Sequence, residues 1–135
     1  MKPPGVFCSG GLFLFCGGIC MRILLVEPGK APRPTEIGDG LESMQVVVGG
    51  SIQAVYPFEE PVALVCNDEG KLLGLPLNRV LRLDTGEIYD VIAGTFFLCA
   101  APPDSDRFAS LTEEQIARYS ERFRAIELFP EVRHG

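Results

Sequence analysis

The sequence predicts a single α+β domain in which a small four-stranded mixed sheet has its helices packed on one face. Short apolar runs bounded by glycine and proline indicate strands, and two longer stretches repeat their apolar residues at helical spacing. The chain has 135 residues, 47% of them hydrophobic and 22% charged, which is typical of one globular domain. The expected order is strand, helix, strand, strand, short helix, strand, helix over residues 21–128.

The first half of this order begins with a buried strand over residues 22–27, closed by a proline-glycine turn. Residues 35–37 could be extended, and Asp39 is suited to cap a helix that ends at a pair of glycines. Residues 51–56 alternate as a strand does, and the apolar run 62–66 should pair with it in antiparallel orientation. The first strand, the helix and the second strand should form a right-handed crossover.

The second half is harder to assign between residues 77 and 81, where a nearby glycine and proline leave room only for a short helical turn. Residues 88–93 and 95–100 form one long strand or two linked strands around Gly94. A glycine inside a strand indicates a bulge or a close backbone approach.

A last helix should begin at Ser110, which forms a capping box with Glu113, and should reach about Arg124. Its inward face is expected to carry Ile116, Tyr119 and Phe123.

The two chain ends are expected to lie outside the domain. Residues 1–20 carry Lys2 as their one charge, and codons for Gly17 and Gly18 can spell a ribosome-binding sequence shortly before Met21. We therefore expect translation to start at Met21, with a signal or lipoprotein segment and a genuine extension as the alternatives. Residues 129–135 are expected to be a frayed tail.

The charge and the cysteine content indicate which classes of partner and which cellular location to expect. Twelve basic and eighteen acidic side chains give a net charge of −6, which argues against direct nucleic-acid binding and against an anionic membrane surface. Cys66 and Cys99 lie inside apolar runs, as small core residues do. Such thiols indicate a reducing compartment, and the expected location is cytoplasmic.

Familiar catalytic patterns are missing from the sequence. The one histidine is His134, next to the C-terminus, and no phosphate-binding loop motif occurs. We therefore assign no catalytic residue, no metal ligand and no cofactor.

Two polar residues in an apolar stretch are the leading binding candidates. Arg79 could hold a phosphate or carboxylate in a bidentate contact, with Asn78 beside it. In the structural alternative, Arg79 pairs with Glu59, Glu60 or Asp90 and Asn78 caps a turn.

Three further positions supplement this pair. Tyr56 could stack on a base or pack at a strand end, and Lys30 could contact an anion or lie in a solvated turn. Asp90 follows Tyr89 and, with Asp84 and Glu87, could hold a divalent cation or form a polar turn leading into a strand.

Five segments in this order together resemble an uncharacterised bacterial and phage family, domain of unknown function 3846, over about residues 21–124. They are Val26 to Lys30, Leu41 to Gly50, Tyr56 to Phe58, Gly74 to Arg79 and Ile88 to Phe96. Members of that family typically begin at the equivalent of Met21, so residues 1–20 depart from its pattern. The resemblance implies a protein of phages or mobile elements, without an established reaction, and draws attention to Tyr56, Asn78, Arg79, Tyr89, Asp90 and Gly94.

The leading hypothesis is a non-enzymatic binding module that could form homo-oligomers. It would act in counter-defence, by sequestering a small nucleotide-like ligand or by blocking a host protein. The expected ligand-binding residues are Asn78, Arg79, Tyr56, Asp90, Tyr89 and Lys30. The alternatives are a carboxylate- or metal-dependent hydrolase and an acidic decoy for a host protein that binds nucleic acid.

Overall fold

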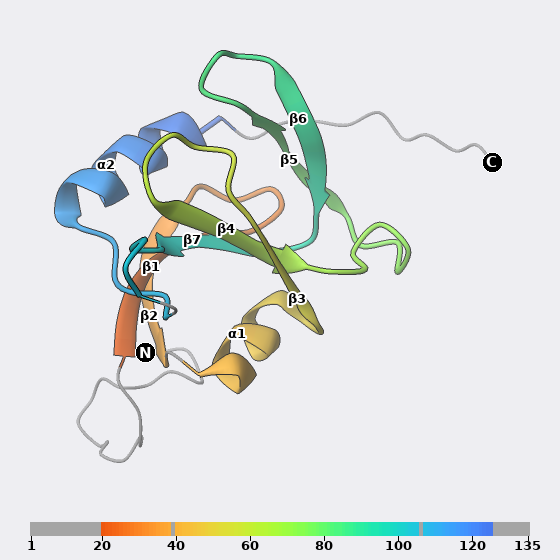
Figure 1. Ribbon diagram of the computed structural model, residues 1–135. Helices are drawn as coiled ribbons and strands as arrows, with labels where there is room; N and C mark the ends of the chain where they lie inside the picture. The colour runs from red at the N-terminus through yellow and green to blue at the C-terminus, as the bar shows by residue number, and fades with distance from the viewer. Residues whose placement is uncertain (1–19, 39, 106, 126–135) are drawn as a thin grey trace.

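The computed structural model describes residues 20–38, 40–105 and 107–125, which form two sheets and two helices (Figure 1). The larger sheet has five strands in the order β2-β1-β7-β4-β3, and the smaller pairs β5 with β6. The strands are β1 (Cys20–Val26), β2 (Arg33–Gly38), β3 (Ile52–Val55), β4 (Val62–Asn67), β5 (Leu77–Arg82), β6 (Ile88–Ala93) and β7 (Phe96–Ala100); the helices are α1 (Leu41–Val48) and α2 (Glu113–Arg122). The α+β class is confirmed, but the sheet expected to be four-stranded and mixed has five strands, and its pairings are all antiparallel.

The additional strand of the larger sheet is β2, which pairs with β1 from Arg33 to Gly38. The expectation that residues 35–37 are extended is therefore confirmed. Pro34 cannot donate to a ladder, so this strand is tolerated at the sheet edge, and the surrounding prolines concealed its place in the sheet. Because β2 reverses the chain before α1, β1 and β3 run in opposite directions. The expected right-handed crossover between them is therefore not formed.

Each face of the five-stranded sheet carries one helix, so the prediction that both helices share a face is wrong. Along β1, Leu24 and Val26 join the cluster under α2, whereas Ile23 and Leu25 join the cluster under α1. Every residue of β4 is buried in the same two-sided way. A run that is apolar at each position needs cover on both faces, and the two helices supply it.

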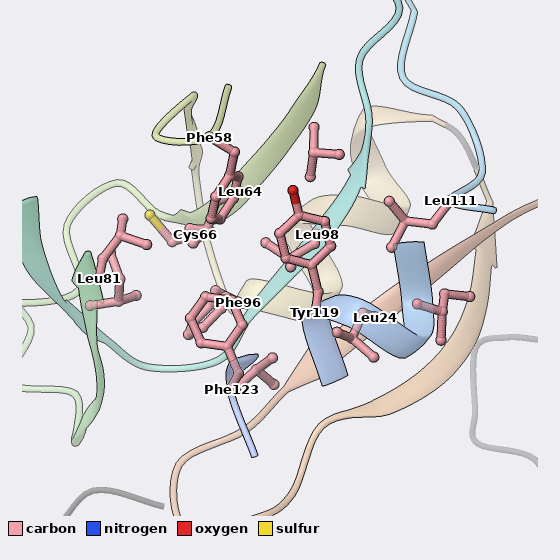
Figure 2. Close-up of a cluster of buried hydrophobic side chains, with 14 residues drawn as sticks. Leu24, Phe58, Leu64, Cys66, Leu81, Phe96, Leu98, Leu111, Tyr119 and Phe123 are labelled. Carbon is pink, nitrogen blue, oxygen red and sulfur yellow. The ribbon is translucent and has the colours of Figure 1, made fainter. Parts of the chain in front are cut away.

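The cluster under α2 is built around aromatic rings (Figure 2). The Phe96 and Phe123 rings meet edge to face at 5.5 Å, and Phe58 lies 4.9 Å from Tyr119. Tyr119 and Phe123 are buried as the sequence predicts, and Ile116 joins them.

The helix ends differ in detail from the sequence expectations. The cap of α1 is Gly40, with no side-chain hydrogen bond, while Asp39 lies outside the described residues. In α2 the capping box is formed by Thr112 and Gln115, because Ser110 instead accepts a hydrogen bond from the Arg22 amide at 2.9 Å.

The β5–β6 hairpin corrects a second prediction. Residues 77–82 form a strand rather than a helical turn, with a bulge at Asn78 opposite β6. Gly94, at a φ of +86°, separates β6 from β7 and sends them into different sheets. The alternative of two linked strands around Gly94 is therefore confirmed.

Parts of the sequence expectations fall outside the described residues. Residues 1–19 and 126–135, which hold nearly all of the expected leader and the whole expected tail, are among them. Within the described ranges, neither helix has the length and apolar character that crossing a membrane requires.

Candidate functional site

Arg79 lies inside the protein, with 2% of its surface exposed. Its Nε donates to the Phe123 carbonyl at 3.0 Å, and its Nη2 donates to the Lys30 carbonyl at 2.7 Å. The guanidinium thus joins the end of α2 to the β1–β2 turn. Lys30 itself is exposed and meets Arg79 through its backbone oxygen rather than its ammonium group.

Asn78 extends the same buried network. Its Nδ2 donates to the Val26 carbonyl at 3.0 Å and to the Gly94 carbonyl at 2.9 Å, and its Oδ1 accepts from Arg79 Nη1 at 2.7 Å. We call Asn78 and Arg79 the buried clamp, because they tie β5 to the ends of β1, β6 and α2. A ligand would have to displace these contacts to reach either side chain.

Two of the three acids proposed as structural partners of Arg79, Glu60 and Asp90, pair with other side chains. Glu60 accepts from Gln115 at 2.8 Å and pairs with Arg118, and Asp90 pairs with Lys71 at 2.6 Å. The sequence could not reveal that carbonyl groups would surround the guanidinium.

Tyr56 lies elsewhere, on the wall of an open depression of about 210 Å³ that Asn78 and Arg79 do not line. Its side chain is 60% exposed at the end of β3. The other lining residues belong to the segment after β7: Ala101, Pro102, Pro103, Ser105, Arg107 and Phe108. The structure therefore separates the stacking candidate from the anion-binding candidates.

The three carboxylates proposed for a cation are also not gathered. Asp84 pairs with Arg122 at 2.7 Å, and this hydrogen bond lowers the pKa of Asp84. Burial raises the pKa of Asp90, but the hydrogen bonds from Lys71 and from the Val91 amide, together with the positive charge of Lys71, leave the pKa below its usual value. Within the described ranges, histidine, cysteine, aspartate and glutamate form no group of three that could hold a metal ion.

A smaller depression of about 160 Å³ lies where β4, the β4–β5 loop and β6 meet. Cys66, Lys71 and Asp90 are among its lining residues. Burial, with a smaller contribution from nearby carboxylates, raises the pKa of the Cys66 thiol to about 11. A thiol that stays protonated at neutral pH is a poor nucleophile, so this depression has no reactive cysteine.

Because burial raises the pKa values of two thiols, we expect the protein to lose stability at alkaline pH. Burial raises the pKa of Cys99 to about 12 and that of Cys66 to about 11, from a usual value of 9.0. The stability that the buried, protonated thiols contribute is fully present below pH 9 and is lost as the pH rises towards their folded-state pKa values. We expect each thiol to remove about 1 kcal/mol from the free energy of unfolding by pH 10. Urea unfolding at pH 7 and pH 10 measures this, and replacing both cysteines with alanine should flatten the pH dependence.

Large apolar side chains gather on the outside of the β4–β5 loop and the β5–β6 hairpin. We call these residues the hairpin patch, and each is between 42% and 86% exposed: Leu72, Leu73, Leu77, Ile88 and Tyr89. The Lys71–Asp90 ion pair and the 2.7 Å hydrogen bond from the Gly94 amide to the Pro76 carbonyl hold the loop against the strands. Figure 1 shows this loop beside the hairpin, away from both helices.

Comparison with known proteins assigns one family to nearly all of the described residues. The family model named Domain of unknown function (DUF3846) matches residues 21–124. The chain belongs to the DUF3846 family. No curated protein and no solved structure matches it.

The DUF3846 match covers the buried clamp and the hairpin patch alike. The two clamp residues were predicted as candidate site residues because asparagine and arginine are conspicuous in an apolar stretch. The hairpin patch was not predicted, although Leu72 and Leu73 follow a strong turn signal and precede Gly74. Two leucines in a loop of this kind are the signal that could have identified this surface.

Proposed function

We propose that this DUF3846 domain is a binding module that recognises another protein through the hairpin patch. One observation carries the proposal: of the eight large apolar side chains exposed in the described residues, five belong to the hairpin patch. Large apolar side chains that are exposed in one region of a small domain commonly mark a protein-interaction site.

The two depressions found in the described residues favour a protein partner over a small ligand. Pockets for small molecules usually enclose about 300–1,000 Å³. The depressions beside Tyr56 and Lys71 reach about 210 and 160 Å³ and are open to solvent. With the guanidinium of Arg79 buried, the nucleotide-like ligand expected from the sequence loses its proposed anion contact.

The patch also has the composition of an interface centre. Leucine, isoleucine and tyrosine bury a large area, and the tyrosine hydroxyl can still donate a hydrogen bond at the edge of the contact. Tyr89 and Ile88 extend from a strand, so their backbone is fixed before binding. Blocking a host protein, the counter-defence role that the family resemblance suggests, would use a surface of this kind.

A photo-crosslinking amino acid in place of Leu73 tests the proposal. We expect irradiation of the cells that naturally express the protein to yield one discrete crosslinked product. The matched control carries the same group in place of Val46, which is 78% exposed on α1 and lies outside the patch. Equal products from both positions, or none from Leu73, would contradict a docking role for the patch.

A further inference from the structure

The polar rim of the hairpin patch is dominated by carboxylates. Four of them are exposed beside the apolar residues: Asp68, Glu69, Glu87 and Asp90. Two exposed cations share the rim, Lys71 and Arg82. The difference, two positive minus four negative, is a local charge of −2 within a chain whose net charge is −6.

The backbone places these charges against the apolar side chains. Asp68 and Glu69 lie in the same loop as Leu72, and Asp90 directly follows Tyr89 in β6. Leu72 and Asp90 line one depression together with Asp68 and Glu69. Three of the four carboxylates therefore lie beside Leu72, on the surface that a partner would cover.

This rim discriminates between possible partners. Two copies of the chain that joined patch to patch would set carboxylate rims opposite each other, and like charges across an interface oppose association. A homo-oligomer through this surface is therefore disfavoured. An apolar surface edged with lysine or arginine would gain the same apolar contact and opposite charges.

Resting on the proposed function, we infer that the partner of the hairpin patch is a basic amphipathic protein surface. Its apolar side chains cover Leu72, Leu73 and Tyr89, and its lysine or arginine side chains face the carboxylate rim. Because the rim is exposed, its main effect is on the association rate, which salt should reduce.

Two synthetic peptides test this inference against the full chain labelled for NMR. One forms an amphipathic helix with a leucine face and a lysine face, and the other replaces every lysine with glutamate. We expect the lysine peptide to shift the amide signals of Leu72, Leu73, Leu77, Ile88 and Tyr89 and to bind about ten-fold or more tightly than the glutamate peptide at low salt.

Matched variants test whether the leucines and the carboxylate rim both contribute to binding of the lysine peptide. Leu72→Ser with Leu73→Ser should abolish the shifts, whereas Val46→Ser should retain them. Asp68→Asn with Glu69→Gln should weaken the lysine peptide several-fold and reduce its salt dependence.

The outcomes separate this inference from the proposed function. If both peptides bind the patch equally, or the glutamate peptide binds more tightly, the basic partner is wrong and the docking surface stands. If neither peptide shifts the patch signals, the proposed function fails as well. Undiminished binding of the lysine peptide to the Leu72→Ser, Leu73→Ser variant would reduce the effect to unspecific charge attraction and overturn the inference.

Discussion

Replacing Arg79 with methionine is expected to lower the free energy of unfolding by about 3 kcal/mol or more. Methionine preserves much of the buried alkyl stem but removes the donors that satisfy the carbonyls of Phe123 and Lys30. The Asn78 Oδ1 also loses its 2.7 Å contact. Buried acceptors left without donors each cost about 1–3 kcal/mol, so the losses accumulate. Urea unfolding followed by circular dichroism measures the change.

Arg33→Met is the matched control for this variant. Arg33 pairs with Glu27 at 2.7 Å, but half of its side chain is exposed. An exposed pair contributes about 0–1 kcal/mol, so this substitution should be nearly neutral. Equal effects at Arg79 and Arg33 would mean that the buried clamp does not stabilise the fold, and a ligand-binding role for Arg79 would regain weight.

The expected destabilisation of Arg79 variants also affects how a binding experiment should be designed. A variant that unfolds loses every ligand, so loss of binding in an Arg79 or Asn78 variant cannot by itself identify a site. Substitutions in the exposed hairpin patch avoid this ambiguity, since Leu72 and Leu73 contribute little to the core. Ligand binding by the predicted residues stays a prediction for that reason.

Local patterns in the sequence predicted the elements whose signals are local. The turn at Gly94, the αL stop at Gly49 and the inward face of α2 all depend on neighbouring residues. The role of Arg79 could not be predicted in this way, because the carbonyls of Phe123 and Lys30 that it holds lie 44 and 49 residues away in the chain. Burial of an arginine depends on which backbone groups the fold delivers, and the sequence near Arg79 contains no trace of them.

The sheet shows the same limit at a larger scale. Residues 35–37 were expected to be extended, and β2 confirms this, but they were not assigned to the sheet because prolines usually exclude strands; an edge position removes that objection at Pro34. The separate β5–β6 sheet was overlooked because residues 77–82 alternate poorly around the bulge at Asn78. Without that hairpin, the exposed residues Leu77, Ile88 and Tyr89 could not be assigned to paired strands.

A second large effect is expected at Gly70, the glycine from which the patch-bearing loop departs. A Cβ at this position would lie 2.7 Å from the backbone oxygen of Ala93 in β6. Because that oxygen belongs to the main chain, a side-chain rotation cannot relieve the contact. We expect Gly70→Ala to cost roughly 1–3 kcal/mol in urea unfolding, as overpacking usually does.

Gly40→Ala provides the comparison, since Gly40 has a φ of −86° and open space around its Cβ direction. Because Gly40 caps α1 and alanine is a poorer cap than glycine, this substitution should cost about 1 kcal/mol or less. The loop at Gly70 also carries Lys71 and Leu72, so moving it should weaken the 2.6 Å Lys71–Asp90 contact and displace part of the hairpin patch. Gly70→Ala should therefore reduce binding of the lysine peptide even under conditions where the variant is fully folded. A variant that stays folded, keeps its stability and binds the peptide unchanged would show that the loop does not need its close approach to β6 to present the patch.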